Sequence, residues 1–273
     1  MMQAQKQLRN FRQRQVNAKR ISRQQVVLRK NLERVYYKRL NTLFRRFIRV
    51  RMHLYKEYGS YDVEVATRSL NEELFPTTLA QYKKIFAAIY RMNENRYDYL
   101  KKQDEYFVFG RSVDIEALVA SYFASRQLFL SNISRRMAQR IQNDIIAGRA
   151  ENLSIREIAD NITKKYLPIA SSRAILIART ETGSAAGFAD FSYHKQLADD
   201  TGASVKKQWT AVNDLRTRSA HSAANGQEVL MDEDFIIGGM PMAYVGDPRG
   251  GAKNVINCRC VIVYADEQDI VLN

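Results

Sequence analysis

The sequence predicts a mainly α-helical N-terminal body with long helices, followed by a small α+β module at the C-terminus. No glycine precedes Gly59 and no proline precedes Pro76, so nothing interrupts a helix over the first 58 residues. Near residue 200 the composition changes: seven of the 12 glycines and two of the four prolines fall in residues 202–273. We therefore expect a basic helical arm (1–53), a helical body (54–200) and a small α+β module (201–273).

The positive charge of the chain is concentrated in the arm. Residues 1–53 hold 16 Lys and Arg against one acid, Glu33, whereas the formal charge of the whole chain is +14. The rest of the chain is therefore close to neutral. A block of this kind usually meets nucleic acid, an anionic surface or an acidic partner protein. A solvated helix face or a frayed tail is the alternative that composition leaves open.

Within the arm, the apolar residues from Leu28 to Ile48 recur at helical spacing. This half is predicted to dock, and the Gln- and Arg-rich residues before it are predicted to project. A helix of 50 residues would reach roughly 75 Å, too long for a compact domain of this size. The projecting half offers cations for DNA phosphates without reading the base sequence: Lys6, Arg9, Arg12, Arg14, Lys19, Arg20 and Arg23. The apolar stripe favours a second hypothesis, a helix that docks on an acidic face of a partner protein.

The body contains four further predicted helices. One begins at Pro76 and runs to about Tyr99, and the next runs from about Asp114 to Ala147 with apolar residues three, four or seven apart. Ser154 and Glu157 form a capping box for another helix, which Pro168 is expected to end. Ser171 or Ser172 would then cap a last helix that reaches about Leu197.

Short β-rich runs distinguish the module: 204–211, 228–231 and 258–264. Asn225-Gly226 is a strong tight-turn signal between two of these runs.

An ordered set of polar residues lies in this module. The chain reads W-x4-D-x-R-T-R-x-x-H from Trp209 to His221, and N-C-R-C from Asn257 to Cys260. Together with Arg179-Thr180-Glu181, this order resembles the phage Mu F-like family, the minor head or head morphogenesis proteins of tailed phages. The resemblance covers roughly the last 100 residues.

The resemblance implies a structural virion component that is present in few copies at or near the portal vertex. It implies roles in head morphogenesis and in DNA packaging or ejection. The implied partners are the portal protein, the packaged double-stranded DNA, and a major capsid or scaffolding protein. The implied location is the capsid interior, after assembly in the host cytoplasm. Some relatives carry a fused toxin domain; because the chain ends nine residues after Tyr264, none is expected here.

The polar set also has a purely physical interpretation, a structural clamp that pins the loops of a small domain. Asp214 could accept hydrogen bonds from Arg216 or Arg218, or cap the short helix that follows. Trp209, the only tryptophan, is expected to anchor the core, and Arg259 to pair with Asp214, Glu181 or Asp247. The predicted clamp residues are Glu181, Trp209, Asp214, Arg216, Arg218, His221, Asn257 and Arg259.

A metal site is the alternative interpretation of the same region. His221, Cys258 and Cys260 are ligands that suit zinc, with Asp214 as a fourth. Against zinc, the C-x-C spacing is tighter than that of common zinc motifs. Two buried reduced thiols beside a hydrogen-bonded histidine would explain the same residues, so no cofactor is assigned from sequence.

We do not expect an enzyme. The motifs of zinc deaminases, H-E-x-x-H metalloproteases and P-loop proteins are missing. A thiol-dependent enzyme, with a cysteine nucleophile and His221 as base, remains an alternative beside a zinc-dependent one. The sequence also holds no apolar run of the length that spans a bilayer, so no membrane partner is expected.

Overall fold

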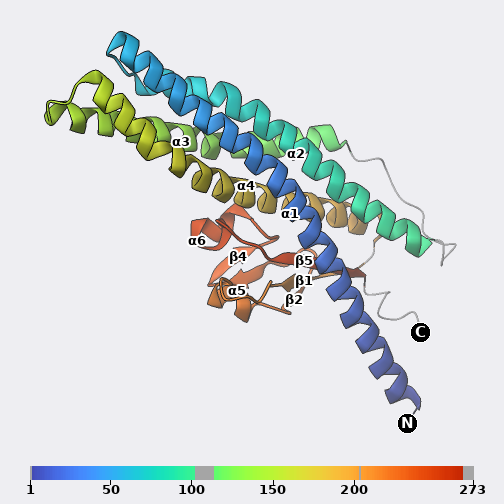
Figure 1. Ribbon diagram of the computed structural model, residues 1–273. Helices are drawn as coiled ribbons and strands as arrows, with labels where there is room; N and C mark the ends of the chain where they lie inside the picture. The colour runs from blue at the N-terminus through green and yellow to red at the C-terminus, as the bar shows by residue number, and fades with distance from the viewer. Residues whose placement is uncertain (1, 102–113, 203, 267–273) are drawn as a thin grey trace. The chain divides into compact units, whose positions relative to one another are not determined.

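The computed structural model describes the backbone of residues 2–101, 114–202 and 204–266, and side chains within 19–96, 114–202 and 204–264. Four long helices come first: α1 (Met2–Tyr58), α2 (Val63–Lys101), α3 (Ile115–Ala150) and α4 (Ile155–Thr201). Short strands and helices follow from residue 205 onward (Figure 1). The predicted fold class, a helical body with a small α+β module, is confirmed.

The chain forms two compact units. The bundle unit consists of residues 33–84 and 114–178, and the sheet unit of residues 1–32, 85–113 and 179–273. Helices α1, α2 and α4 each contribute a segment to both units. The division of the chain at residues 53 and 200 stays a prediction about which segments fold separately.

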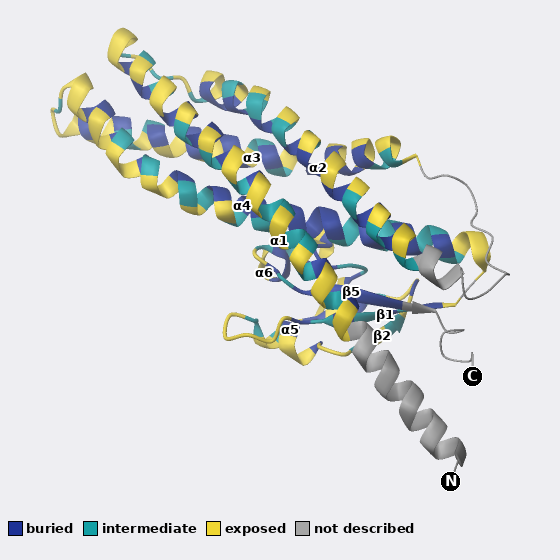
Figure 2. Ribbon diagram, turned by 45° about the vertical axis from the view of Figure 1, so that its right-hand side comes forward, coloured by how far each residue is buried: buried dark blue, intermediate teal, exposed yellow. Residues whose placement is uncertain are grey.

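The bundle unit is built from segments of all four long helices. One face of each segment is buried and the other is exposed, which is the pattern of amphipathic helices around a shared core (Figure 2). Its α1 segment buries Tyr36, Leu40, Phe44 and Ile48 completely. The apolar stripe of the arm thus packs inside the chain itself. The interpretation of this stripe as a surface for a partner protein is therefore wrong for these residues, because their apolar side chains are already removed from water.

Two prolines that were expected to mark helix boundaries, Pro76 and Pro168, lie inside helices, and this corrects the predicted boundaries. Helix α2 begins 13 residues before Pro76, at Val63, and α4 continues through Pro168 to Thr201. A proline in a helix interior costs about 3 kcal/mol, but here residues on both sides of each proline are buried: Leu74 and Thr78 around the first, Tyr166 and Ala170 around the second. Packing outweighs the local cost.

Ser171 consequently caps no helix, because it lies inside α4. Its hydroxyl donates to the Asn41 side chain at 2.9 Å instead. The predicted capping box of Ser154 and Glu157 is confirmed, and Asp114 caps α3, which was not predicted. Asp114 accepts from the backbone N–H of Ala117 at 3.0 Å, and Glu157 and Ser154 satisfy each other's backbone N–H groups at 2.9 and 3.2 Å.

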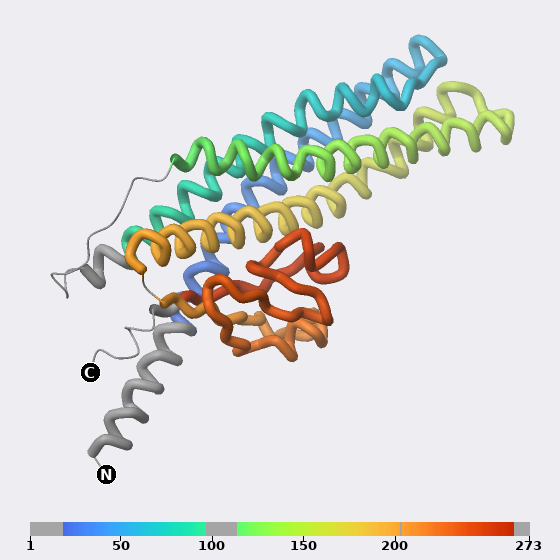
Figure 3. The backbone as a smooth tube through the Cα atoms, turned by 180° about the vertical axis from the view of Figure 1, so that it is seen from behind, coloured from blue at the N-terminus to red at the C-terminus, as the bar shows by residue number. Residues whose placement is uncertain are grey.

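The sheet unit contains a three-stranded antiparallel sheet in the order β2-β1-β5. Its C-terminal part is the orange and red portion of the tube in Figure 3. The strands of the sheet are β1 (Val205–Thr210), β2 (Glu228–Leu230) and β5 (Val261–Asp266), which confirms strands in the three predicted runs. A hairpin of β3 (Phe235–Ile237) and β4 (Met240–Met242) was not predicted. Two short helices, α5 (Ser219–Ala223) and α6 (Gly251–Val255), and a 3₁₀ turn at Pro248–Gly250 complete the unit.

Strand β1 alternates buried and half-buried residues, so Val205, Lys207 and Trp209 face the core. Asn225, at the predicted turn, accepts from the backbone N–H of Ala211 at 2.9 Å, and Gly226 has a φ of +85°. Helix α4 meets the loop after β4 without intervening side chains: a Cβ at Gly187 would lie 2.1 Å from the carbonyl oxygen of Val245. Glycine is required at that contact.

None of the helices that the structure describes contains a segment long and apolar enough to cross a membrane.

Candidate functional site

The sheet unit brings most of the predicted clamp residues together. Arg259 forms a two-pronged ion pair with Asp214, in which its Nη2 donates to Oδ1 at 2.6 Å. Of the three acids considered for Arg259, Asp214 is therefore the partner. Hydrogen bonds from Arg259 hold the pKa of Asp214 below its usual range.

Asp214 organises the loop before α5 rather than capping that helix. Its Oδ1 accepts from the backbone N–H of Arg216 at 3.0 Å and from the Thr217 hydroxyl at 3.2 Å. Arg218 occupies the N-cap position of α5 without a side-chain cap, and its guanidinium donates to the carbonyl oxygen of Ile256. The Arg216 side chain stays mostly exposed, 3.7 Å from Asp214.

The N-C-R-C segment is held from two helices. Asn257 has a φ of +61° and accepts from Arg179 at 2.8 Å, while its backbone N–H donates to Thr180 at 3.0 Å. From α1, Arg29 donates to the carbonyl oxygen of Cys260 at 2.5 Å. Arg179 and Thr180 thus contact this segment, and the next residue, Glu181, is fully buried.

His221, Cys258 and Cys260 converge in the interior. The Nδ1 atom of His221 lies 3.4 Å from Sγ of Cys260 and 3.5 Å from Sγ of Cys258. The Trp209 ring meets His221 edge-on, with centroids 5.7 Å apart, and is completely buried as predicted. A small pocket beside this cluster is lined in part by Val212.

The two thiols differ in acidity. A hydrogen bond from Cys260, with a smaller contribution from His221, holds the pKa of Cys258 well below its usual range against the effect of burial. The same hydrogen bond and burial raise the pKa of Cys260. A thiolate at one sulfur that accepts a hydrogen bond from the other thiol can act as a nucleophile or bind a metal ion.

A second polar centre, not predicted from sequence, surrounds Asp190 on α4. Its carboxylate accepts from Gln25 of α1 and from Asn93 of α2, each at 2.8 Å. Burial raises the pKa of Asp190 to about 7, although Asn93 and two arginines oppose the shift. Burial lowers the pKa of neighbouring His194 to about 3, and its Nδ1 lies 2.8 Å from the Asp190 carbonyl oxygen.

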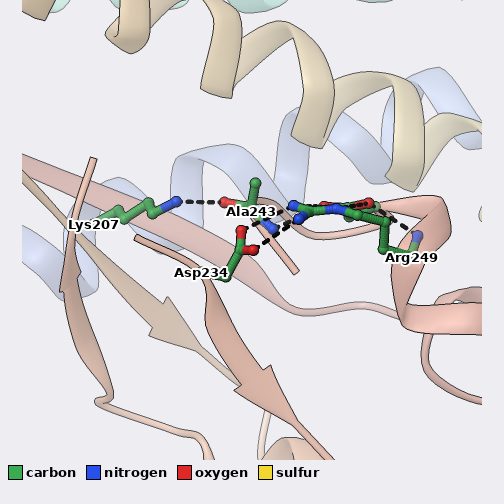
Figure 4. Close-up of polar contacts among 5 residues, drawn as sticks. Lys207, Asp234, Ala243 and Arg249 are labelled. Carbon is green, nitrogen blue, oxygen red and sulfur yellow. Dashed lines mark hydrogen bonds and ion pairs between the residues drawn. The ribbon is translucent and has the colours of Figure 1, made fainter. Parts of the chain in front are cut away.

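A third polar centre joins β1 to the loops around the hairpin (Figure 4). Lys207 is completely buried and donates to the carbonyl oxygen of Ala243 at 2.9 Å. Arg249 bridges Asp234, at 2.7 and 2.8 Å, and Asp247, at 2.6 Å. Asp247, considered as a partner for Arg259, therefore pairs with Arg249. Burial lowers the pKa of Lys207 to about 8.

The proposed DNA-contacting residues are placed only in part. Lys19, Arg20 and Arg23 are exposed on α1. The side chains of Lys6, Arg9, Arg12 and Arg14 lie outside the described residues, although α1 itself extends back to Met2.

The Asp190 centre and the Arg29 contact, neither of which was predicted, are each assembled from segments far apart in the chain. Gln25 and Asp190 are 165 residues apart, and Arg29 and Cys260 are 231 apart. A glutamine and an arginine four residues apart in a Gln- and Arg-rich arm carry no local signal that separates them from exposed neighbours. Lys207 is different, because its place between the apolar residues Val205 and Trp209 on a period of two marks it as inward-facing.

Comparison with known proteins gives a match over the region that holds the clamp and the Cys/His cluster. Residues 139–263 match the family described as Phage Mu protein F like protein. No solved structure matches the chain.

Two curated relatives match as well. An NAD(+)–arginine ADP-ribosyltransferase, EFV, of Enterococcus faecalis is 33% identical over 151 residues, which are 55% of this chain and 30% of that protein. Minor head protein GP7 of Bacillus phage SPP1 is 27% identical over 209 residues, 70% of this chain and 65% of that protein. The chain thus spans less than two thirds of either relative. On the family match and the phage relative together, residues 139–263, the family region, are similar to the phage Mu F-like family of head morphogenesis proteins.

Proposed function

We propose that this protein is a minor head protein of a tailed phage, a structural component of the virion at or near the portal vertex. There it aids head morphogenesis and the packaging or ejection of DNA. The observation that carries the proposal is the similarity to the minor head protein of phage SPP1, which extends over 70% of the chain. A structural role also agrees with the polar residues of the family region, since Asp214, Arg259 and Asn257 are engaged in holding loops together.

The similarity to an ADP-ribosyltransferase is not evidence for transferase activity in this chain. It covers 30% of that protein, so most of the transferase has no counterpart in the aligned region. The alternative, a zinc- or thiol-dependent enzyme, keeps one supporting observation, the 3.5 Å contact between the Cys258 thiol and Nδ1 of His221.

The test of the portal location is co-purification of the full chain with the portal protein of its phage at low and high salt. We expect a complex that survives high salt if apolar contacts dominate, and one that dissociates if the charged arm dominates. Absence of a complex at every salt concentration would contradict the portal location. Truncating the chain at residue 54 is unsuitable, because it removes Tyr36, Leu40 and Phe44 from the bundle core.

We further propose that the N-terminal part of α1 contacts DNA without sequence preference. If all seven cations of the set Lys6, Arg9, Arg12, Arg14, Lys19, Arg20 and Arg23 neutralise phosphates, the logarithm of the binding constant should fall with the logarithm of salt concentration with a slope of about −6. Changing all seven to Gln should abolish most of that slope, as measured by fluorescence anisotropy with duplexes of unrelated sequence.

A matched control neutralises seven exposed cations of the bundle unit: Arg34, Lys38, Arg39, Arg49, Arg68, Arg156 and Lys164. This variant has the same net charge as the variant with seven substitutions in residues 6–23, and we expect it to keep most of the slope. Equal losses in the two variants would show that overall charge, rather than the cations of residues 6–23, attracts DNA.

A further inference from the structure

Three buried side chains of the sheet unit direct metal-ligating atoms toward one point. They are His221, Cys258 and Cys260, the only such group of three found among the side chains that the structure describes. Their candidate ligand atoms all lie within 4.8 Å of one another. Each side chain is at most 4% exposed, so the cluster is sealed from bulk water on most sides.

The backbone explains how the C-x-C spacing brings both thiols to one side. Cys258 and Cys260 are buried while Arg259 between them is half-exposed, the alternation of an extended chain in which every second residue shares a face. These residues lead directly into β5, and Arg259 points to Asp214 on the other side. Helix α5 presents His221 to the face that carries the sulfurs.

The distances fit a tetrahedral zinc ion. With Zn–S bonds of about 2.3 Å and Zn–N bonds of about 2.0 Å, the nitrogen-to-sulfur edge of a tetrahedron is roughly 3.5 Å. The observed separations from Nδ1 of His221 are 3.4 and 3.5 Å. Two thiolates and an imidazole also form a donor set that favours zinc over magnesium or calcium.

Hydrogen bonding alone explains the cluster less well. A ring nitrogen makes one good hydrogen bond, along its N–H or its lone pair, yet two sulfurs lie almost equally far from Nδ1. A metal ion would satisfy both sulfurs and one ring nitrogen at once.

We propose that His221, Cys258 and Cys260 bind a zinc ion, with the fourth coordination position at the adjoining pocket. Asp214 is not the fourth ligand, because Arg259 holds both of its carboxylate oxygens. The pocket is lined by Arg216 and Arg218, so a water molecule or a small anion completes the coordination. The ion would link α5 to the start of β5. This inference does not depend on the role of the protein in the phage head.

The experiment measures the metal content of the full chain, produced in zinc-supplemented medium and purified without a metal-affinity tag. We expect about one tightly held zinc ion per chain, as for a structural site. Cys258→Ser, Cys260→Ser and His221→Ala should lose it. His53→Ala, which removes an exposed histidine on α1, should retain it. Wild-type protein without zinc, or equal zinc in the His221→Ala and His53→Ala variants, would overturn the proposal.

A second measurement uses the unaltered chain, since each ligand substitution also removes a core contact. After removal of zinc with a chelator, titration with Co²⁺ should produce thiolate-to-metal charge-transfer absorption and the intense visible bands of a tetrahedral site. The melting temperature should fall on chelation and recover with zinc. No cobalt absorption, or a Cys258–Cys260 disulfide in freshly purified protein, would overturn the site.

Discussion

Asp190 shows how a single side chain ties three helices together in the sheet unit. Its carboxylate accepts from Gln25 and Asn93, both of which are buried. Asp190→Ala should lower the free energy of unfolding by about 2–5 kcal/mol, because two buried amide donors lose their acceptor. Chemical denaturation monitored by circular dichroism measures this loss.

Asp190→Asn is the matched variant for Asp190→Ala. It removes the charge but keeps an acceptor, and the Gln25 amide can turn to offer its Oε1, which lacks a partner in the described structure. We expect the free energy of unfolding to fall by about 1 kcal/mol near neutral pH, the net contribution of one hydrogen bond. If the two variants prove equally unstable, the carboxylate charge matters more than the hydrogen bonds.

Lys207 gives the sheet unit a pH-dependent stability. Because burial lowers its pKa in the folded protein to about 8 from 10.5, the unfolded chain binds the proton more tightly between these values. Stability therefore rises with pH across this window, by at most about 3 kcal/mol from this group. Lys207→Met should flatten the rise, as measured by urea unfolding between about pH 8 and 10. An unchanged slope would show that Lys207 titrates normally.

At the scale of elements, the sheet unit depends on backbone contact between α4 and the loop after β4. Gly187→Ala would place a Cβ 2.1 Å from the carbonyl oxygen of Val245, and backbone cannot yield as a side chain does. We expect a loss of at least about 2 kcal/mol, although alanine favours an isolated helix by about 1 kcal/mol. Thermal unfolding measures it. Ser172→Ala, on the exposed face of α4, should change stability by less than about 0.5 kcal/mol. A stabilised Gly187→Ala variant would contradict the contact.

Elements governed by local chemistry could be predicted from sequence. The capping box at Ser154 and Glu157 lies where the spacing of these residues predicts it, and the uninterrupted α1 follows from the lack of Gly and Pro. The boundaries at Pro76 and Pro168 could not be predicted, because burial of their neighbours overrides the local cost. The β3–β4 hairpin escaped notice since its strands are three residues long and one contains Pro241.

The site divides in the same way. The sequence left three possible acidic partners for Arg259, and in the structure Arg259 pairs with one of them, Asp214. His221 and the two cysteines could be named as possible ligands from their residue types, but the distances between them come only from the fold. The Asp190 centre could not be foreseen, because its partners come from helices that the sequence separates by about a hundred residues or more.

At the scale of the molecule, two features bear on function. The family region, residues 139–263, includes the end of α3 and all of α4 as well as most of the sheet, so it extends beyond the module recognised by composition. The basic excess lies on α1, whose later segment is committed to the bundle core while Lys19, Arg20 and Arg23 remain exposed. The proposed DNA contact therefore concerns the first half of this helix and not its apolar stripe.

The most direct test of a head-protein role is quantitative mass spectrometry of purified virions of the phage that encodes this chain. We expect to detect the protein in infectious particles, in fewer copies than the major capsid protein and at a constant ratio to the portal protein. Its absence from infectious particles, with the protein abundant in the infected cell, would contradict a structural place in the virion.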